Sequence, residues 1–198
     1  MGKRDDILDT ALALFNRHGY HAVGVDLIRD EAHVSKMTLY KYFATKELLV
    51  EEVLKQRHER FRQSLELAVS KVSDPVGRFR EVFNWHIRWF LSRQFHGCMF
   101  IKATGEFQHT AQYQNVSRQH KNWVRCLIKA LLVEAGIKAA DQKASHAQVV
   151  LDGMLVSASI FGSLDHVDAA WFCICDCVGI EHVALDKPDL STLADSPF

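Results

Sequence analysis

Residues 33–46 combine positive charge, hydroxyl groups and aromatic rings without a single acidic side chain. Lys36, Lys41 and Lys46 supply the charge, and the aromatic side chains lie between them. Ser35 can accept a hydrogen bond from the first free N–H groups of a helix that begins at Lys36. Ammonium and hydroxyl groups on one short helix suit a phosphate backbone and the edges of bases better than a hydrophobic core. This run therefore predicts a DNA recognition helix.

The chain as a whole carries no basic excess. It has 198 residues, with 24 lysines and arginines against 24 aspartates and glutamates, so the formal net charge is zero. Binding to DNA must then come from a local patch, because counterion release depends on the face that meets the duplex. With 48% hydrophobic and 24% charged residues, the composition is that of a soluble globular protein.

Export and membrane insertion are not indicated. The first residues form an amphipathic pattern rather than an apolar signal core, and the most apolar later stretch, residues 147–164, is interrupted by Gln148 and Asp152. The five cysteines are an odd number and fit no disulfide scaffold. We therefore expect a cytoplasmic protein with reduced thiols and no membrane partner.

Helical periodicity runs through the whole sequence, and no alternation typical of strands persists. Helices are expected over residues 3–18, about 25–32 and 36–42, followed by a long helix that Thr45 can cap. Two short helices joined by a tight turn and braced by a third make a helix-turn-helix unit.

Beyond about residue 70 the helices become longer and richer in aromatic residues. Asp74 and Pro75 favour a helix start. After a break near Gly97, further helices are expected to about residue 109 and over about 112–135, 139–162 and 165–184. A frayed tail is expected beyond Lys187. The fold class is all-α.

The N-terminal quarter resembles the DNA-binding domain of TetR-type (tetracycline-repressor-like) transcriptional regulators. The resemblance runs from residue 7 to residue 54 and ends in an aromatic-rich Leu-Tyr-x-Tyr-Phe pattern. The matching residues are Ala11, Phe15, Gly19, Tyr20, Val25, Ile28, Ala32, Val34, Ser35, Lys36, Thr38, Leu39, Tyr40, Tyr42, Phe43, Lys46, Glu47 and Leu48. The family implies a helix-turn-helix DNA-binding domain over residues 1–46 and a helical ligand-binding and dimerisation domain over residues 47–198.

The same resemblance implies which side chains would meet DNA. Tyr40, Tyr42 and Lys46 would mainly contact phosphates. Met37, Thr38 and Lys41 would lie nearest to the bases. Lys36 belongs to the same interface, whereas Phe43 is expected in the core. The alternative for the whole set is a solvated helix face.

Three positions depart from the usual family pattern. Val23 and Gly24 replace the Thr or Ser expected at the start of the second helix, and Asp26 lies too deep to replace that cap fully. His33 stands where the turn usually has Gly, and would adopt a left-handed conformation at modest cost. Met37 replaces a Gly that is common inside the recognition helix.

Aromatic residues in the C-terminal part suggest a cavity for a small molecule. Trp85 and Trp89 are four residues apart and share one face of a helix. The other candidates for a mixed aromatic and polar lining are His86, Cys98, Phe100, Phe107 and Met154. Such a lining would suit a small, largely apolar or aromatic effector. The alternative is that these side chains form hydrophobic core.

The cysteines and one Glu/His pair are further candidates for chemistry. Cys98 follows a glycine at a helix start, where a redox role competes with simple packing. Cys173, Cys175 and Cys177 are spaced like metal ligands, but on a helix Cys175 points away from the other two. Glu106 and His109 alone make a poor ligand set. Neither a metal nor another cofactor is expected.

The last two helices are apolar around much of their circumference, so a monomer would expose too much apolar surface. We expect a homodimer through these helices, reading a pseudo-palindromic operator in double-stranded DNA. The predicted function is a ligand-responsive transcriptional regulator, most simply a repressor released by its effector. One alternative is a DNA-associated helical protein that has no effector and acts through a protein partner. An enzyme is not expected, because no nucleophile elbow, phosphate loop or metal signature occurs.

Overall fold

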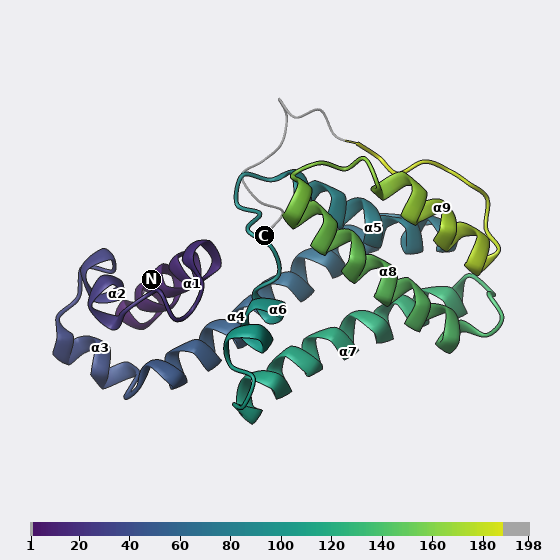
Figure 1. Ribbon diagram of the computed structural model, residues 1–198. Coiled ribbons are helices and arrows are strands. Elements are labelled where there is room, and N and C mark those ends of the chain that lie inside the picture. The colour runs from purple at the N-terminus through teal and green to yellow at the C-terminus, as the bar shows by residue number, and fades with distance from the viewer. Residues whose placement is uncertain (1, 188–198) are drawn as a thin grey trace. The chain divides into compact units, whose positions relative to one another are not determined.

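The computed structural model describes residues 2–187, and all regular elements in that range are helices (Figure 1). Their bounds in chain order are α1 (Lys3–His18), α2 (Val25–Glu31), α3 (Lys36–Tyr42), α4 (Lys46–Ser70), α5 (Pro75–Leu91), α6 (Met99–Glu106), α7 (Ala111–Glu134), α8 (Ala140–Phe161) and α9 (Val167–Val178). The predicted all-α class is therefore confirmed.

The chain divides into two compact units, which are described separately. The first unit takes the chain up to Arg60 together with Cys98–His120, and the second holds Phe61–Gly97 and the chain from Lys121 onward. Helices α4 and α7 each continue from one unit into the other. The division expected at residue 46 concerns function and stays a prediction, whereas these units are defined by packing.

In the first unit, α1, α2 and α3 pack against one another around a small apolar core. Phe15 from α1, Ile28 from α2 and Leu39 from α3 are each at most 2% exposed. Helix α1 ends where Gly19 adopts a φ of 82°, a conformation that favours glycine. The predicted bounds of the first and third helices are confirmed, and the second helix ends one residue before its predicted end.

The departures from the family pattern have visible structural consequences. Gly24 precedes α2 in an extended conformation and provides no side-chain cap. His33 adopts a φ of 52°, so the left-handed conformation expected for the turn between the two short helices is confirmed. Such a φ costs little for His compared with β-branched residues. The turn is therefore built without its usual glycine.

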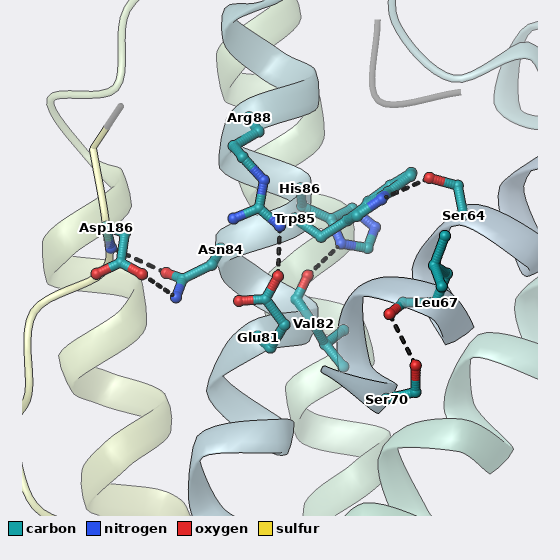
Figure 2. Close-up of polar contacts among 10 residues, drawn as sticks. All are labelled: Ser64, Leu67, Ser70, Glu81, Val82, Asn84, Trp85, His86, Arg88 and Asp186. Atoms are coloured by element: carbon teal, nitrogen blue, oxygen red, sulfur yellow. Dashed lines mark hydrogen bonds and ion pairs between the residues drawn. The ribbon is translucent and has the colours of Figure 1, made fainter. Parts of the chain in front are cut away.

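The core of the second unit is built on the aromatic face of α5. Phe79 and Phe83 lie 5.9 and 4.9 Å from the Trp171 ring of α9, measured between ring centroids. The segment after α9 is tied back to this core: the Asn84 amide donates to the Asp186 carboxylate at 2.8 Å and its carbonyl accepts the Asp186 N–H at 2.9 Å (Figure 2). The Trp171 indole also donates to the Val183 carbonyl at 2.7 Å.

Two helix ends differ from the sequence prediction. The last helix, expected over residues 165–184, stops at Val178 because Gly179 takes a φ of 80° and ends it. The helix that follows Gly97 ends at Glu106 rather than near residue 109. The tail expected to be frayed beyond Lys187 lies outside the described residues.

Within the described range, α8 is long and apolar enough to cross a membrane by length and composition. This is weak evidence for a membrane span, since helices from the cores of soluble proteins pass the same test.

Replacing the N-cap of α5 should destabilise the second unit. The Asp74 carboxylate accepts the Gly77 N–H at 2.5 Å, and Pro75 follows at the first position of the helix. We expect Asp74→Ala to lower the free energy of unfolding by about 1 kcal/mol, measured by urea denaturation. Asp74→Asn, which keeps an accepting oxygen, is the matched control. Equal losses in the two variants would contradict this role.

Candidate nucleic-acid interface

Helix α3 is fixed at both ends, which leaves one of its faces free for contact. At its start, Ser35 Oγ accepts the Thr38 N–H at 3.0 Å and lies 2.8 Å from the Thr38 hydroxyl. At its end, Leu39 and Phe43 are each 2% exposed and anchor the helix in the core. The predicted cap and the predicted burial of Phe43 are both confirmed.

The opposite face of α3 carries the side chains that the sequence assigned to DNA. Lys36, Met37, Tyr40, Lys41 and Tyr42 are exposed. Met37 reaches 83% exposure, which is unusual for a large apolar side chain, while Tyr40 and Tyr42 are each 40% exposed. The Lys41 ammonium lies 5.9 Å from the centroid of the Tyr42 ring. This face therefore presents cations, hydroxyls and one apolar tip together.

Two of the predicted residues are less exposed than the others. The Thr38 side chain is partly engaged by Ser35. Lys46 opens α4 and is half-buried, with its ammonium 6.0 Å from the Phe15 ring centroid. Burial lowers the pKa of Lys46, although the nearby carboxylates of Glu106 and Glu47 favour its charged form.

Helix α2 carries three acidic residues, Asp26, Asp30 and Glu31, beside a single arginine. Arg29 donates to Asp26 at 2.7 Å and to Asp30 at 2.7 Å, so these two carboxylates share one guanidinium. Lys36 approaches Asp26 only to 4.0 Å. Helix α2 therefore keeps a net negative charge, and attraction to a phosphate backbone must come from the lysines of α3 itself.

The corner between α1 and α2 is held by a single carboxylate from α6. Glu106 accepts the Tyr20 N–H with both oxygens at 3.0 Å, the His21 N–H at 2.7 Å, and lies 2.9 Å from His21 Nδ1. A Cβ at Gly19 would lie 2.9 Å from Glu106 Oε1, so the carboxylate approaches the backbone where only glycine leaves room. Burial opposes the charged form of Glu106, but the donors of His21 and Tyr20 outweigh it and lower the Glu106 pKa.

Further hydrogen bonds attach the same part of the chain to α1 and α4. The buried Tyr20 hydroxyl donates to the Met99 carbonyl at 2.9 Å, and burial raises its pKa well above the usual value. Lys102 donates to the Asn16 carbonyl at 2.8 Å. Tyr113 of α7 donates to the Glu47 carbonyl at 3.1 Å. Helix α6 and the start of α7 therefore belong to the same packing unit as α1–α3.

This role of Glu106 was missed by the sequence analysis, which considered it only as half of a weak metal-ligand pair with His109. Gly19 and Glu106 are both visible in the sequence, but they lie so far apart along the chain that no local pattern links them. His109 is exposed beyond the end of α6.

Three of the predicted ligand-binding residues form one buried aromatic cluster in the second unit. Trp85 and Trp89 lie 4.7 and 6.0 Å from the Phe61 ring centroid, and His86 lies 5.6 Å from it. The Trp85 indole donates to Ser64 Oγ at 3.0 Å (Figure 2). These contacts are those of a packed core. A ligand that entered the cluster would have to replace the hydrogen bond between Trp85 and Ser64.

His86 is held neutral in this cluster. Its Nδ1 donates to the Val82 carbonyl at 2.7 Å, as Figure 2 shows. Complete burial lowers the His86 pKa to about 3. The imidazole is therefore uncharged at neutral pH.

The other predicted ligand-binding residues lie elsewhere. Phe100 stacks on His120 in the first unit, with ring centroids 3.8 Å apart, and Phe107 lies 4.6 Å from the Tyr113 ring. Cys98 is buried before the start of α6. Met154 lines a groove between α8 and α9 in the second unit. The seven residues are thus divided between the two units, and their role in ligand binding stays a prediction.

Removing the charge of Glu106 should weaken the first unit in a pH-dependent way. Because the Glu106 pKa is lowered on folding, its contribution is present above the unfolded value of 4.5 and is lost as pH falls through the folded value. We expect Glu106→Gln to destabilise the protein at pH 7 by about 1–3 kcal/mol. The loss should shrink towards pH 3, as measured by urea unfolding across this range.

Glu66→Gln is the control, since Glu66 pairs with Arg62 on the surface of α4 in the second unit. A Glu106→Gln loss that stays constant between pH 7 and pH 3 would contradict the assigned contacts.

Comparisons with known proteins show similarity concentrated in the N-terminal part of the chain. The family model described as "Bacterial regulatory proteins, tetR family" matches residues 7–53. The transcriptional repressor KstR2 of Mycolicibacterium smegmatis is 34% identical over 85 residues, which cover 41% of this chain and 42% of the repressor. The transcriptional activator FasR of the same organism is 35% identical over 78 residues, covering 39% of this chain and 36% of the activator. The matches thus span about two fifths of each of these relatives.

The likeness in fold extends over most of the chain. A TetR-family transcriptional regulator from Streptomyces coelicolor superposes with a TM-score of 0.78 at 25% identity, covering 89% of this chain and 93% of the other. Reduced NemR from E. coli gives a TM-score of 0.80 at 18% identity, with 89% and 97% covered. KstR2, FasR and the Streptomyces coelicolor protein are named as transcriptional regulators, the class of protein that the sequence predicted for this chain. Residues 7–53 thus match the tetR family of bacterial regulatory proteins, and the fold of most of the chain is similar to that of a solved TetR-family regulator.

Proposed function

We propose that this protein is a ligand-responsive repressor that binds a pseudo-palindromic operator as a homodimer. The observation that carries the DNA-binding part is the exposed face of α3, where cations, hydroxyls and Met37 project from a helix anchored by Leu39 and Phe43. Such a face can enter the major groove while its anchored side stays in the core. KstR2 and FasR are named as a repressor and an activator, so both directions of control occur among the relatives.

Within this face the side chains divide by chemistry. Tyr40, Tyr42 and Lys46 carry hydroxyl or ammonium groups that suit phosphate oxygens and would set the register of α3 on the duplex. Met37, Thr38 and Lys41 would face base edges, with Lys41 able to donate to guanine acceptors. Lys36 adds positive charge at the start of the helix. Affinity would then depend strongly on salt concentration.

The dimer would form through α8 and α9, which pack against each other. Val149, Ile160 and Phe161 of α8 are 72%, 68% and 61% exposed, a large apolar surface for a chain alone in water. A two-fold interface would bury this surface and place two recognition helices on successive turns of the duplex.

The effector would act through the connections between the units. The chain crosses between them three times, and two of these crossings lie inside α4 and α7. A small apolar or aromatic molecule bound beside Trp85, His86 and Trp89 in the second unit would favour one arrangement of these helices, and DNA would favour the other. Each would then weaken the binding of the other by the same factor.

Removing a cation from α3 tests the DNA-binding face. We expect Lys41→Ala to weaken binding by about tenfold or more and to reduce the salt slope by about one unit. The measurement is fluorescence anisotropy at several salt concentrations, with duplexes enriched from a random-sequence pool by the unmodified protein. Lys129→Ala on α7, a residue that pairs with Asp141, is the matched control and should bind as the unmodified protein does. Unchanged affinity and slope for Lys41→Ala would contradict the assignment.

Met37 generates a prediction about the sequence that is read. The thymine methyl is the apolar group that the major groove offers, and an apolar side chain that is 83% exposed on a cationic helix suits it. Replacing thymine by uracil in the enriched duplex should weaken binding about fourfold, the value of one buried methyl group at about 0.8 kcal/mol. Met37→Ala should lose this sensitivity. Equal sensitivity in both proteins, or none in either, would rule out the contact.

A further inference from the structure

The thiols of α9 lie on the face that the proposed dimer would bury. Cys173 and Cys177 are exposed, whereas Cys175 is buried. Cys173 and Cys177 are about one helical turn apart and share a face. The prediction that Cys175 points away from them is therefore confirmed. Two thiols are thus presented on one face of α9.

A base lies beside one of these thiols. His146 of α8 places Nδ1 3.3 Å from Cys177 Sγ, within reach of the thiol proton. Both side chains line a groove of about 280 Å³ between α8 and α9, which Cys173 and Lys143 also line. The thiolate is the reactive form of cysteine, and a neighbouring imidazole can take up its proton. The groove leaves room for a small oxidant beside both thiols.

Cys173 lies near the middle of α9 and lines the first groove. A second groove continues along α8 and α9, and Val150 lines both grooves. Among the residues that line the second groove, none is an Asp, Glu, Lys or Arg, so two copies of this part of the face can meet without burying unpaired charges. In a two-fold interface, residues near the axis meet the same residues of the other copy. The thiols of two copies are therefore brought towards each other.

We propose that Cys173 and Cys177 form a redox-sensitive disulfide link between two copies of this chain. The inference rests on the proposed dimer through α8 and α9. The oxidant is a peroxide, which accepts the two electrons that two thiols release when they form a disulfide. The link would keep two copies of the chain, and so their two recognition helices, joined even at concentrations where the reduced dimer dissociates.

The reaction balances in two steps. The Cys177 thiol gives its proton to His146, and the thiolate sulfur attacks the peroxide, breaking the O–O bond and forming a sulfenic acid. From hydrogen peroxide, the released hydroxide takes up the proton as water. A thiol of the other copy then displaces the sulfenic oxygen, which leaves as a second water, and the S–S bond forms. Two thiols are oxidised and one peroxide is reduced.

The test uses the full chain and hydrogen peroxide. Peroxide-treated protein should run on a non-reducing denaturing gel at twice its chain mass of 22.6 kDa and return to that mass with a reductant. Mass spectrometry of the linked peptides should find the bond at residue 173 or 177. The Cys173→Ser/Cys177→Ser variant should lose the link, and Cys126→Ser, which removes an exposed thiol of α7, should keep it. His146→Ala should form the link at least several-fold more slowly.

Sedimentation of the reduced protein separates the possible failures. A reduced dimer that peroxide does not link overturns this inference and leaves the proposed dimer in place. A reduced monomer overturns both. A bond mapped to Cys126 or Cys98 overturns the assignment of the thiols, and an unchanged rate in His146→Ala overturns the role of the imidazole.

Discussion

The Glu106 carboxylate accepts two consecutive backbone N–H groups at the corner between α1 and α2, and the geometry of the first unit depends on this contact. A carboxylate can approach so closely because Gly19 has no side chain there and adopts a positive φ of 82°. A charged group that satisfies several backbone donors stabilises more than a neutral hydrogen bond does. The orientation of α2, and through it that of α3, is thereby fixed to a helix that lies far along the sequence.

This contact shows that the helix-turn-helix does not pack on its own. The helix-turn-helix needs α1–α3, but its packing unit also includes α6 and the start of α7. The hydrogen bonds of Tyr20 and Lys102 reinforce the same attachment. A displacement of α6 would therefore disturb the hydrogen bonds that Glu106 accepts from the Tyr20 and His21 N–H groups at the α1–α2 corner. The corner that precedes the proposed recognition helix thus shares its contacts with α6.

Local patterns were sufficient to predict much of the fold. Helices α1 and α3 were predicted with their observed ends, because apolar periodicity, the Ser35 cap and Gly19 all act over a few residues. The left-handed conformation of His33 also followed from its position in the turn. The last helix was predicted too long because its apolar pattern continues past Gly179, while the chain beyond it is held by Asn84 and Trp171, contacts that a local pattern does not contain.

The candidate site was predictable only in part, for the same reason. The exposed face of α3 could be assigned because a helix that buries Leu39 must expose its opposite side. The shared face of Trp85 and Trp89 was predicted too, but their packing on Phe61 of α4 depends on tertiary structure. The role of Glu106 could not be predicted, because its partners His21 and Tyr20 lie 85 and 86 positions before it in the sequence.

The most direct test of the account is amide hydrogen exchange of the protein with and without an enriched DNA duplex. Binding through the exposed face of α3 predicts slower exchange in α2, α3 and the start of α4, with a scrambled duplex giving no such protection at the same salt concentration. Protection confined to α8 and α9, or saturating binding that leaves α3 unprotected, would contradict the assignment of α3 as the element that meets DNA.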